Sequence, residues 1–234
     1  MKNTFIILGM TMVLFFSSFS VIQNANLAFS EDYDQLLEFK KWAQTHDISL
    51  IGINKNSDTL LEYGFDPSSE EILIEDVPNV LNAAEILYTI PENVLESMKG
   101  KTIYFSTENG RGLALISSYH KPIENMNGGI IIEQNIDPYY VVHELGHIID
   151  LEQPPNIIQK ELFSIDFIDN QNNEKILNGY VSFYSLTNVE ENFAEHFAYY
   201  VVNGEDFREI AESDVLIEKK YNFLKNYVFD GIEF

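Results

Sequence analysis

The sequence has no cysteine among its 234 residues, which excludes a disulfide framework and a lipoprotein attachment site. Basic residues are also scarce: 14 lysines and arginines stand against 37 aspartates and glutamates, and the formal net charge is −23. Such an acidic chain is repelled by nucleic acid and by anionic membrane surfaces, so we exclude both as partners. The charge fits a basic substrate, and it fits equally well an exported protein that resists aggregation.

Long apolar runs are missing except at the start of the chain. Lys2 precedes a mostly apolar stretch over 5–21. Small residues stand at the two positions that a signal peptidase reads, Ala28 and Ser30, and two acidic residues follow them. This order is typical of a secretory signal peptide that is cleaved after residue 30. The alternative is an uncleaved membrane anchor, although the run is near the lower limit for a span. We predict a signal peptide over 1–30 and a secreted protein, and the lack of cysteine favours a Gram-positive bacterium.

The rest of the chain, residues 31–234, is long enough for one substantial core. The 13 tyrosines and 17 phenylalanines of the whole sequence argue against disorder. We expect a single domain and a monomer. Within it, an N-terminal α/β lobe covers about 31–137, one helix covers about 138–152, and a helical C-terminal lobe covers about 153–234.

Short β-rich segments alternate with helical periodicity in the N-terminal part of this domain. The predicted strands are 48–53, 101–106, 113–118 and 130–134, and the predicted helices are 31–45, 79–88, 91–100, 139–151, 189–202 and 214–228. A turn-rich stretch separates the second strand from the third, which predicts that these two form a hairpin. The expected fold class is α+β, with a small twisted mixed sheet covered by helices and a mostly helical C-terminal lobe.

The most informative motif is the run from His143 to His147, which reads His-Glu-Leu-Gly-His. Residues four apart project from one face of a helix, so the two imidazoles can share a zinc ion at about 2.0–2.1 Å each. Glu144 lies about 100° further round the helix, where it reaches toward a water at the fourth coordination position. The alternative is a pair of partly exposed histidines, but apolar neighbours indicate a buried helix, where imidazoles need a hydrogen bond or a metal. The motif therefore predicts one zinc ion, with Glu144 as general base.

A catalytic zinc site takes three protein ligands and keeps one position open, so a further ligand is needed. Glu191 and Glu195 are the best candidates, because they lie four apart in an otherwise apolar helix, where a partly buried acid favours a cation nearby. Spacing alone does not choose between them. Asp150 is a rival on the same helical stripe as the histidines. Its position suits a hydrogen bond that orients an imidazole better than it suits a ligand.

Two runs, residues 143–150 and 182–197, together carry a resemblance to a known family. They resemble the catalytic domain of anthrax toxin lethal factor and are similar to the secreted Pro-Pro endopeptidases. In that family a tyrosine precedes the third zinc ligand by seven residues and a second glutamate follows it by four. Tyr184, Glu191 and Glu195 have these spacings.

The resemblance covers about residues 80–210 and implies a zincin-like metallopeptidase fold. It implies Glu191 as the third zinc ligand, Tyr184 as an active-site hydroxyl, and Glu195 as an acid that holds a ligand histidine. One departure is Asn192, where the relatives carry an aromatic residue.

Together these features predict a secreted zinc-dependent endopeptidase. Its protein or peptide substrate is expected to lie extended along a sheet edge, on strand 113–118 or on strand 130–134. The alternative is a catalytically silent exported zinc-binding protein with a toxin-like docking role. Glu144 favours the enzyme, because a structural zinc site needs no general base and normally fills all four positions.

Overall fold

The computed structural model describes residues 31–53, 77–109, 113–115, 128–152, 161–164 and 178–234. The predicted signal peptide lies outside these ranges. Within them, no helix combines the length and the apolar character that a membrane span requires.

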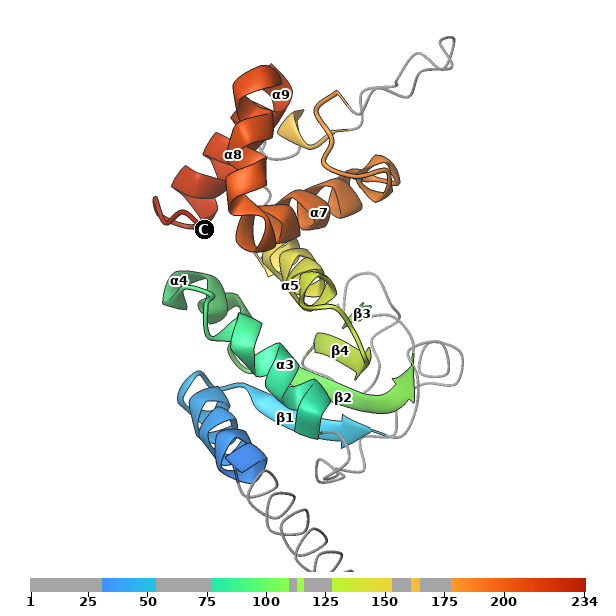
Figure 1. The fold of residues 1–234 in the computed structure, drawn as a ribbon, viewed down its shortest axis with the longest axis vertical. Coiled ribbons are helices and arrows are strands. Elements are labelled where there is room, and N and C mark those ends of the chain that lie inside the picture. Colours follow the sequence, from blue (N-terminus) through green and yellow to red (C-terminus); the bar gives the residue numbers. More distant parts are fainter. Residues whose placement is uncertain (1–30, 54–76, 110–112, 116–127, 153–160, 165–177) are drawn as a thin grey trace, which may run out of the picture.

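Four strands in this part of the chain form one mixed sheet with the order β1-β2-β4-β3 (Figure 1). The strands are β1 (Ser49–Ile53), β2 (Thr102–Asn109), β3 (Leu113–Leu115) and β4 (Gly129–Gln134). β1, β2 and β4 are parallel, and β3 is antiparallel to β4 at the edge. The small mixed sheet predicted from the sequence is therefore present.

The predicted hairpin of the second and third strands is wrong, because β4 lies between β2 and β3. The three consecutive isoleucines of β4, residues 130–132, are fully buried, and a strand buried on both faces takes a central position in a sheet. Gly129 also allows a close approach: a Cβ there would lie 1.9 Å from the carbonyl oxygen of Thr102 on β2. The turn-rich stretch between β2 and β3 in the sequence therefore did not make these two strands neighbours in the sheet.

The helices of the described residues include all six predicted ones, close to their predicted positions, and a helix over 204–213 that was not predicted. They are the helix over 31–45, α3 (Val77–Leu87), α4 (Glu92–Leu95) with a 3-10 turn (Glu96–Met98), α5 (Pro138–Glu152), the 3-10 turn η3 (Tyr184–Leu186), α7 (Val189–Val202), α8 (Gly204–Ser213), and α9 (Val215–Phe223) with a π-helical turn (Leu224–Val228). Figure 1 shows α5 between the sheet and the C-terminal helices α7, α8 and α9.

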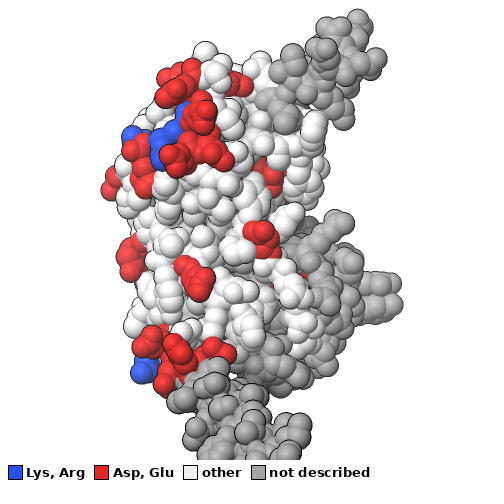
Figure 2. Space-filling model, viewed as in Figure 1, with Lys and Arg blue, Asp and Glu red and all other residues white. Residues whose placement is uncertain are grey.

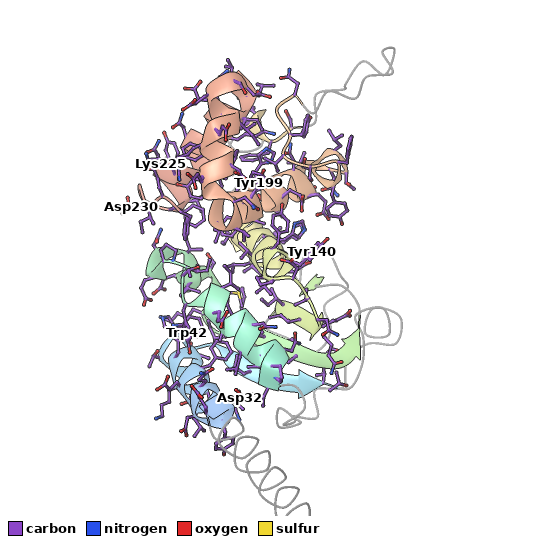
Figure 3. The ribbon with its side chains drawn as sticks, viewed as in Figure 1. Asp32, Trp42, Tyr140, Tyr199, Lys225 and Asp230 are labelled. Atoms are coloured by element: carbon purple, nitrogen blue, oxygen red, sulfur yellow. The ribbon has the colours of Figure 1, made fainter. Side chains whose placement is uncertain are left out.

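Aromatic side chains join the N-terminal helices to the sheet. Phe39 of the helix over 31–45 meets Phe105 of β2 edge to face, with ring centroids 6.5 Å apart. Trp42, which Figure 3 labels on the same helix, meets the ring of Tyr88, which follows α3, and their ring centroids are 5.4 Å apart. Offset and edge-to-face pairs of this kind add to the stabilisation from burial. These contacts hold the helix over 31–45 against β2 and against the end of α3.

Acidic side chains outnumber basic ones on the face of the molecule that Figure 2 shows. In Figure 2 they gather over the C-terminal helices and near the helix over 31–45, with few lysines and arginines beside them. The view agrees with a chain that carries a net charge of −23.

Candidate metal centre

Two helices bring three potential metal ligands to one point. His143 and His147 lie one turn apart on α5, and Glu191 lies in the first turn of α7. The Nε2 atoms of the two histidines are 3.1 Å apart, and Oε2 of Glu191 lies 3.0 Å from the first and 3.3 Å from the second. These three residues form a group that could hold one metal ion.

The geometry of this group fits a zinc ion. Ligand atoms that are about 2.0–2.1 Å from a tetrahedral ion are about 3.3 Å from one another, which is close to the three separations observed. Imidazole nitrogen and carboxylate oxygen are also donors that zinc takes. Oε2 of Glu191 is buried and faces the Nε2 atoms of both histidines, so a cation shared by all three side chains suits its position.

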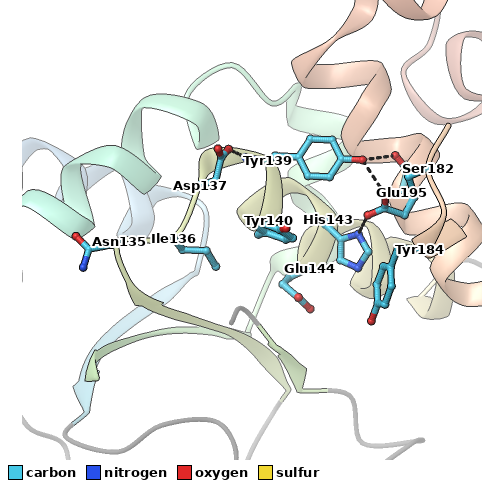
Figure 4. Close-up of a pocket in the computed structure, with 10 residues that line it drawn as sticks. All are labelled: Asn135, Ile136, Asp137, Tyr139, Tyr140, His143, Glu144, Ser182, Tyr184 and Glu195. Carbon is cyan, nitrogen blue, oxygen red and sulfur yellow. Dashed lines mark hydrogen bonds and ion pairs between the residues drawn. The ribbon is translucent and has the colours of Figure 1, made fainter. Parts of the chain in front are cut away.

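Glu195 lies on the other side of the His143 ring. Its Oε1 is 2.8 Å from Nδ1 of His143, and its Oε2 accepts hydrogen bonds from Ser182 Oγ at 2.5 Å and from the Tyr139 hydroxyl at 3.2 Å (Figure 4). A carboxylate at Nδ1 favours the tautomer in which Nε2 carries the lone pair. The arrangement therefore turns Nε2 of His143 toward the metal position.

The electrostatics of the cluster favour a positive charge. Burial would lower the pKa of His143, but contacts with Glu191 and Glu195 and the charge of Glu144 raise it to about 9. Burial would raise the pKa of Glu191, yet its contacts with His143 and His147 lower it to about 2. The carboxylates of Glu191 and Glu195 are thus ionised at neutral pH, and they stabilise either a proton on His143 or a metal ion between the two imidazoles.

A cavity of about 680 Å³ opens beside His143. Its lining residues are Asn135, Ile136, Asp137, Tyr139, Tyr140, His143, Glu144, Ser182, Tyr184 and Glu195. The Glu144 carboxylate and the Tyr184 hydroxyl both lie below the His143 ring in Figure 4. Glu144 is buried, whereas Tyr184 is half exposed and its ring centroid lies 5.8 Å from that of His143. Both side chains can therefore reach a molecule bound in the cavity.

The Tyr184 hydroxyl is held in its protonated form. Partial burial raises its pKa to about 12, and the nearby carboxylate of Glu191 adds to this rise. A protonated hydroxyl that lines the cavity is a hydrogen-bond donor at neutral pH.

A sequence model of the family described as "Putative zinc-binding metallo-peptidase" matches residues 95–233, which is more than half of the chain. The chain belongs to this family of zinc-binding metallopeptidases. Among curated proteins, none matches it. The matched segment contains α5 and α7, and with them all three residues of the cluster. The predicted zinc cofactor is therefore confirmed, by the family and by a cluster that can bind one metal ion.

The structure brings some of the predicted site residues together and leaves one outside the metal cluster. The metal cluster consists of His143, His147 and Glu191, whereas Asp150 is not part of it within the described residues. Spacing left Glu191 and Glu195 equivalent, but the structure places them on opposite nitrogens of the His143 ring.

The sequence did not predict the two residues that donate hydrogen bonds to Glu195. These residues are Tyr139 and Ser182. A signal for each was present. Tyr139 precedes His143 by four residues on the same helical face, and Ser182 begins the second run of the family resemblance.

Gly146 determines how closely the metalloprotein's two site helices approach. A Cβ at this position would lie 3.0 Å from Cα of Ala194 and 3.3 Å from Cβ of Phe197, both on α7. The absence of a side chain therefore lets α7 approach α5 closely enough for Glu191 to meet the two histidines.

Gly146→Ala is expected to destabilise the protein and to weaken zinc binding. On helix propensity alone, alanine would stabilise α5 by about 1 kcal/mol. Overpacking against the α7 backbone should outweigh this gain, since such changes cost about 1–3 kcal/mol. Thermal unfolding of the zinc-free protein and competition with a chromophoric chelator measure the two effects. A higher Tm with unchanged zinc affinity would contradict the close-packing explanation.

Proposed function

We propose that this protein is a secreted zinc-dependent endopeptidase. The observation that carries the proposal is the placement of the His143–His147–Glu191 cluster beside a cavity that Glu144 and Tyr184 also line. A cluster with a structural role would not need a carboxylic acid and a hydroxyl directed at the same cavity.

In the proposed reaction, His143, His147 and Glu191 would hold a zinc ion, which would supply a Lewis acid for the peptide carbonyl and for the attacking water. Glu144 takes a proton from the attacking water as the water oxygen bonds to the carbonyl carbon. The Tyr184 hydroxyl donates a hydrogen bond to the developing oxyanion. Glu144 then returns the proton to the amine as the C–N bond breaks. One water and one peptide bond thus yield a carboxylic acid and an amine, which exchange a proton to give a carboxylate and an ammonium group.

We further propose that the protein belongs to the zincin-like group that includes lethal factor and the Pro-Pro endopeptidases. The spacing of Tyr184, Glu191 and Glu195 supports this grouping, and so does the contact of Glu195 with Nδ1 of His143. An orienting role of Asp150 toward a ligand histidine stays a prediction.

The substrate is proposed to be a protein or peptide that binds in extended form along β3. Of the two candidate strands, β3 is at the edge of the sheet and contacts α5, whereas β4 is paired on both sides over Gly129–Ile131. Main-chain pairing at an edge binds a peptide with little dependence on its sequence. We propose that the enzyme acts outside the cell as a monomer, and the signal-like sequence of residues 1–30 supports export.

Metal analysis together with peptide cleavage tests the proposal. The purified protein is expected to contain about one zinc per chain and to cleave members of a peptide library. A chelator should abolish cleavage, and added zinc should restore it. A protein without bound zinc, or cleavage that a chelator does not affect, would refute the proposed function. Bound zinc with no cleavage of any peptide would favour the docking protein instead.

A further inference from the structure

A buried lysine lies behind the metal centre, on the C-terminal helix α9. The Lys220 side chain is only 3% exposed, and its Nζ donates hydrogen bonds to the carbonyl oxygen of Gly179 at 2.5 Å and to Oδ1 of Asn192 at 3.0 Å. The same Nζ lies 4.6 Å from the ring centroid of Tyr180. Burial lowers its pKa to about 7. Burying an ammonium group is costly, so these contacts require an explanation.

Gly179 is held by α9 from both sides of its backbone. Its N–H donates to Oδ2 of Asp214 at 2.6 Å, while its carbonyl oxygen accepts from Lys220. Its φ is +82°, and a Cβ would lie 2.9 Å from Cβ of Leu216. Glycine suits both the positive φ and the close contact. Asp214 also caps α9, because its Oδ1 accepts from the N–H groups of Leu216 and Ile217.

Residues 180–186, which we call the site segment, run from Gly179 to the metal centre. Ser182 donates to Glu195, which contacts the ligand His143, and Tyr184 lines the cavity. Only two residues, Tyr180 and Val181, lie between Gly179 and Ser182. A displacement of Gly179 would therefore move both side chains relative to the metal.

Lys220 also connects α9 to α7 next to a metal ligand. Its partner Asn192 follows Glu191 in the sequence, is fully buried, and donates from Nδ2 to the carbonyl oxygen of Phe163 at 2.7 Å. An aromatic residue at position 192 would offer Lys220 no amide oxygen. The departure at Asn192 and the buried Lys220 thus belong to one polar network.

We propose that Lys220 and Asp214 form a clamp on Gly179 that positions Ser182 and Tyr184 at the metal centre. Both are positioning residues, since neither contacts the cavity. The clamp deepens the proposed function and rests on it, because Tyr184 is taken to act on the substrate. A purely structural lysine would stabilise the C-terminal lobe without affecting the use of Tyr184, and this difference can be measured.

Lys220→Met keeps an unbranched buried side chain and removes the donor. It is expected to lower kcat by about 10- to 100-fold, as a misplacement on the order of 1 Å does, with about one zinc per chain retained and KM little changed. Lys219→Met, on the exposed neighbour, is the matched control and should behave as the wild type.

A double-mutant cycle separates positioning from stability. Loss of an oxyanion donor in Tyr184→Phe is expected to lower kcat by about 10²–10³-fold. If Lys220 acts through Tyr184, Lys220→Met should lower kcat much less in the Tyr184→Phe protein than in the wild type. Fully additive effects on kcat would overturn the clamp.

Hydrogen exchange tests the clamp without relying on catalysis. Amides of residues 180–186 should exchange faster in Lys220→Met than in the wild type, while protection of α5 stays the same. Asp214→Asn provides a second variant. The asparagine oxygen can still cap α9, but the NH₂ group that replaces Oδ2 cannot accept the hydrogen bond from the N–H of Gly179. If both variants exchange at the wild-type rate in this segment, the clamp is refuted. Faster exchange in a protein that cleaves no peptide would support the clamp and refute only the proposed peptidase.

Discussion

Glu144→Gln is expected to keep about one zinc per chain and to lower the rate of peptide cleavage by about 10²–10⁴-fold. Glutamine has the size of glutamate and fits the same buried position on α5, but it cannot take a proton from water at neutral pH. The side chain is not part of the metal cluster, so the ligands stay intact. Zinc content and kcat, measured on the same preparation, check the two parts of this expectation.

Glu144→Asp is the informative companion variant. It keeps a carboxylate but withdraws it by one methylene, so its loss of activity should fall between those of the wild type and Glu144→Gln. Equal activity in all three proteins would remove Glu144 from the mechanism. Loss of zinc from Glu144→Gln would instead indicate that the site is disturbed, and a thermal unfolding curve would reveal this.

Local patterns predicted the helices of the described residues except α8, which was missed. The aromatic periodicity predicted a helix over 189–202, and α7 has these bounds, beginning after Asn188, whose side chain accepts from the N–H of Glu191 at 2.7 Å. Strand positions were also close to those observed. Strand pairing failed because the partner of β3 follows it at some distance in the sequence, and short-range turn signals contain no information about such a partner.

In the candidate site too, features that depend on one helix were predicted, and features that depend on the packing of two helices were not. Spacing of four on a helix was enough to pair His143 with His147, since that distance depends on one helix alone. The different positions of Glu191 and Glu195 depend on how α7 crosses α5, which Gly146 permits and which no single-helix pattern contains. Tyr139 lies outside the family spacing, and its contact with Glu195 likewise depends on the crossing.

Glu191→Ala is expected to abolish stable zinc binding. The variant leaves two imidazoles without the oxygen that lies 3.0 and 3.3 Å from their Nε2 atoms. Loss of a residue that only orients a ligand costs about 10–100-fold in metal affinity, so loss of a ligand itself should exceed this range. Competition with a chelator of known affinity measures the change, and activity should disappear with the metal.

Two variants on the same helices serve as controls for the loss of zinc affinity in Glu191→Ala. Glu190→Ala removes the neighbouring acid, which is outside the cluster, and should bind zinc like the wild type. Asp150→Ala should at most weaken binding, within the range for an orienting residue. Because a ligand that binds only the folded state raises its stability, zinc should increase the Tm of both controls and leave that of Glu191→Ala unchanged. If zinc raised the Tm of Glu191→Ala as much as that of the wild type, Glu191 would not be the third ligand. Glu195 would then be the first acid to examine, since its Oε1 lies 2.8 Å from Nδ1 of His143.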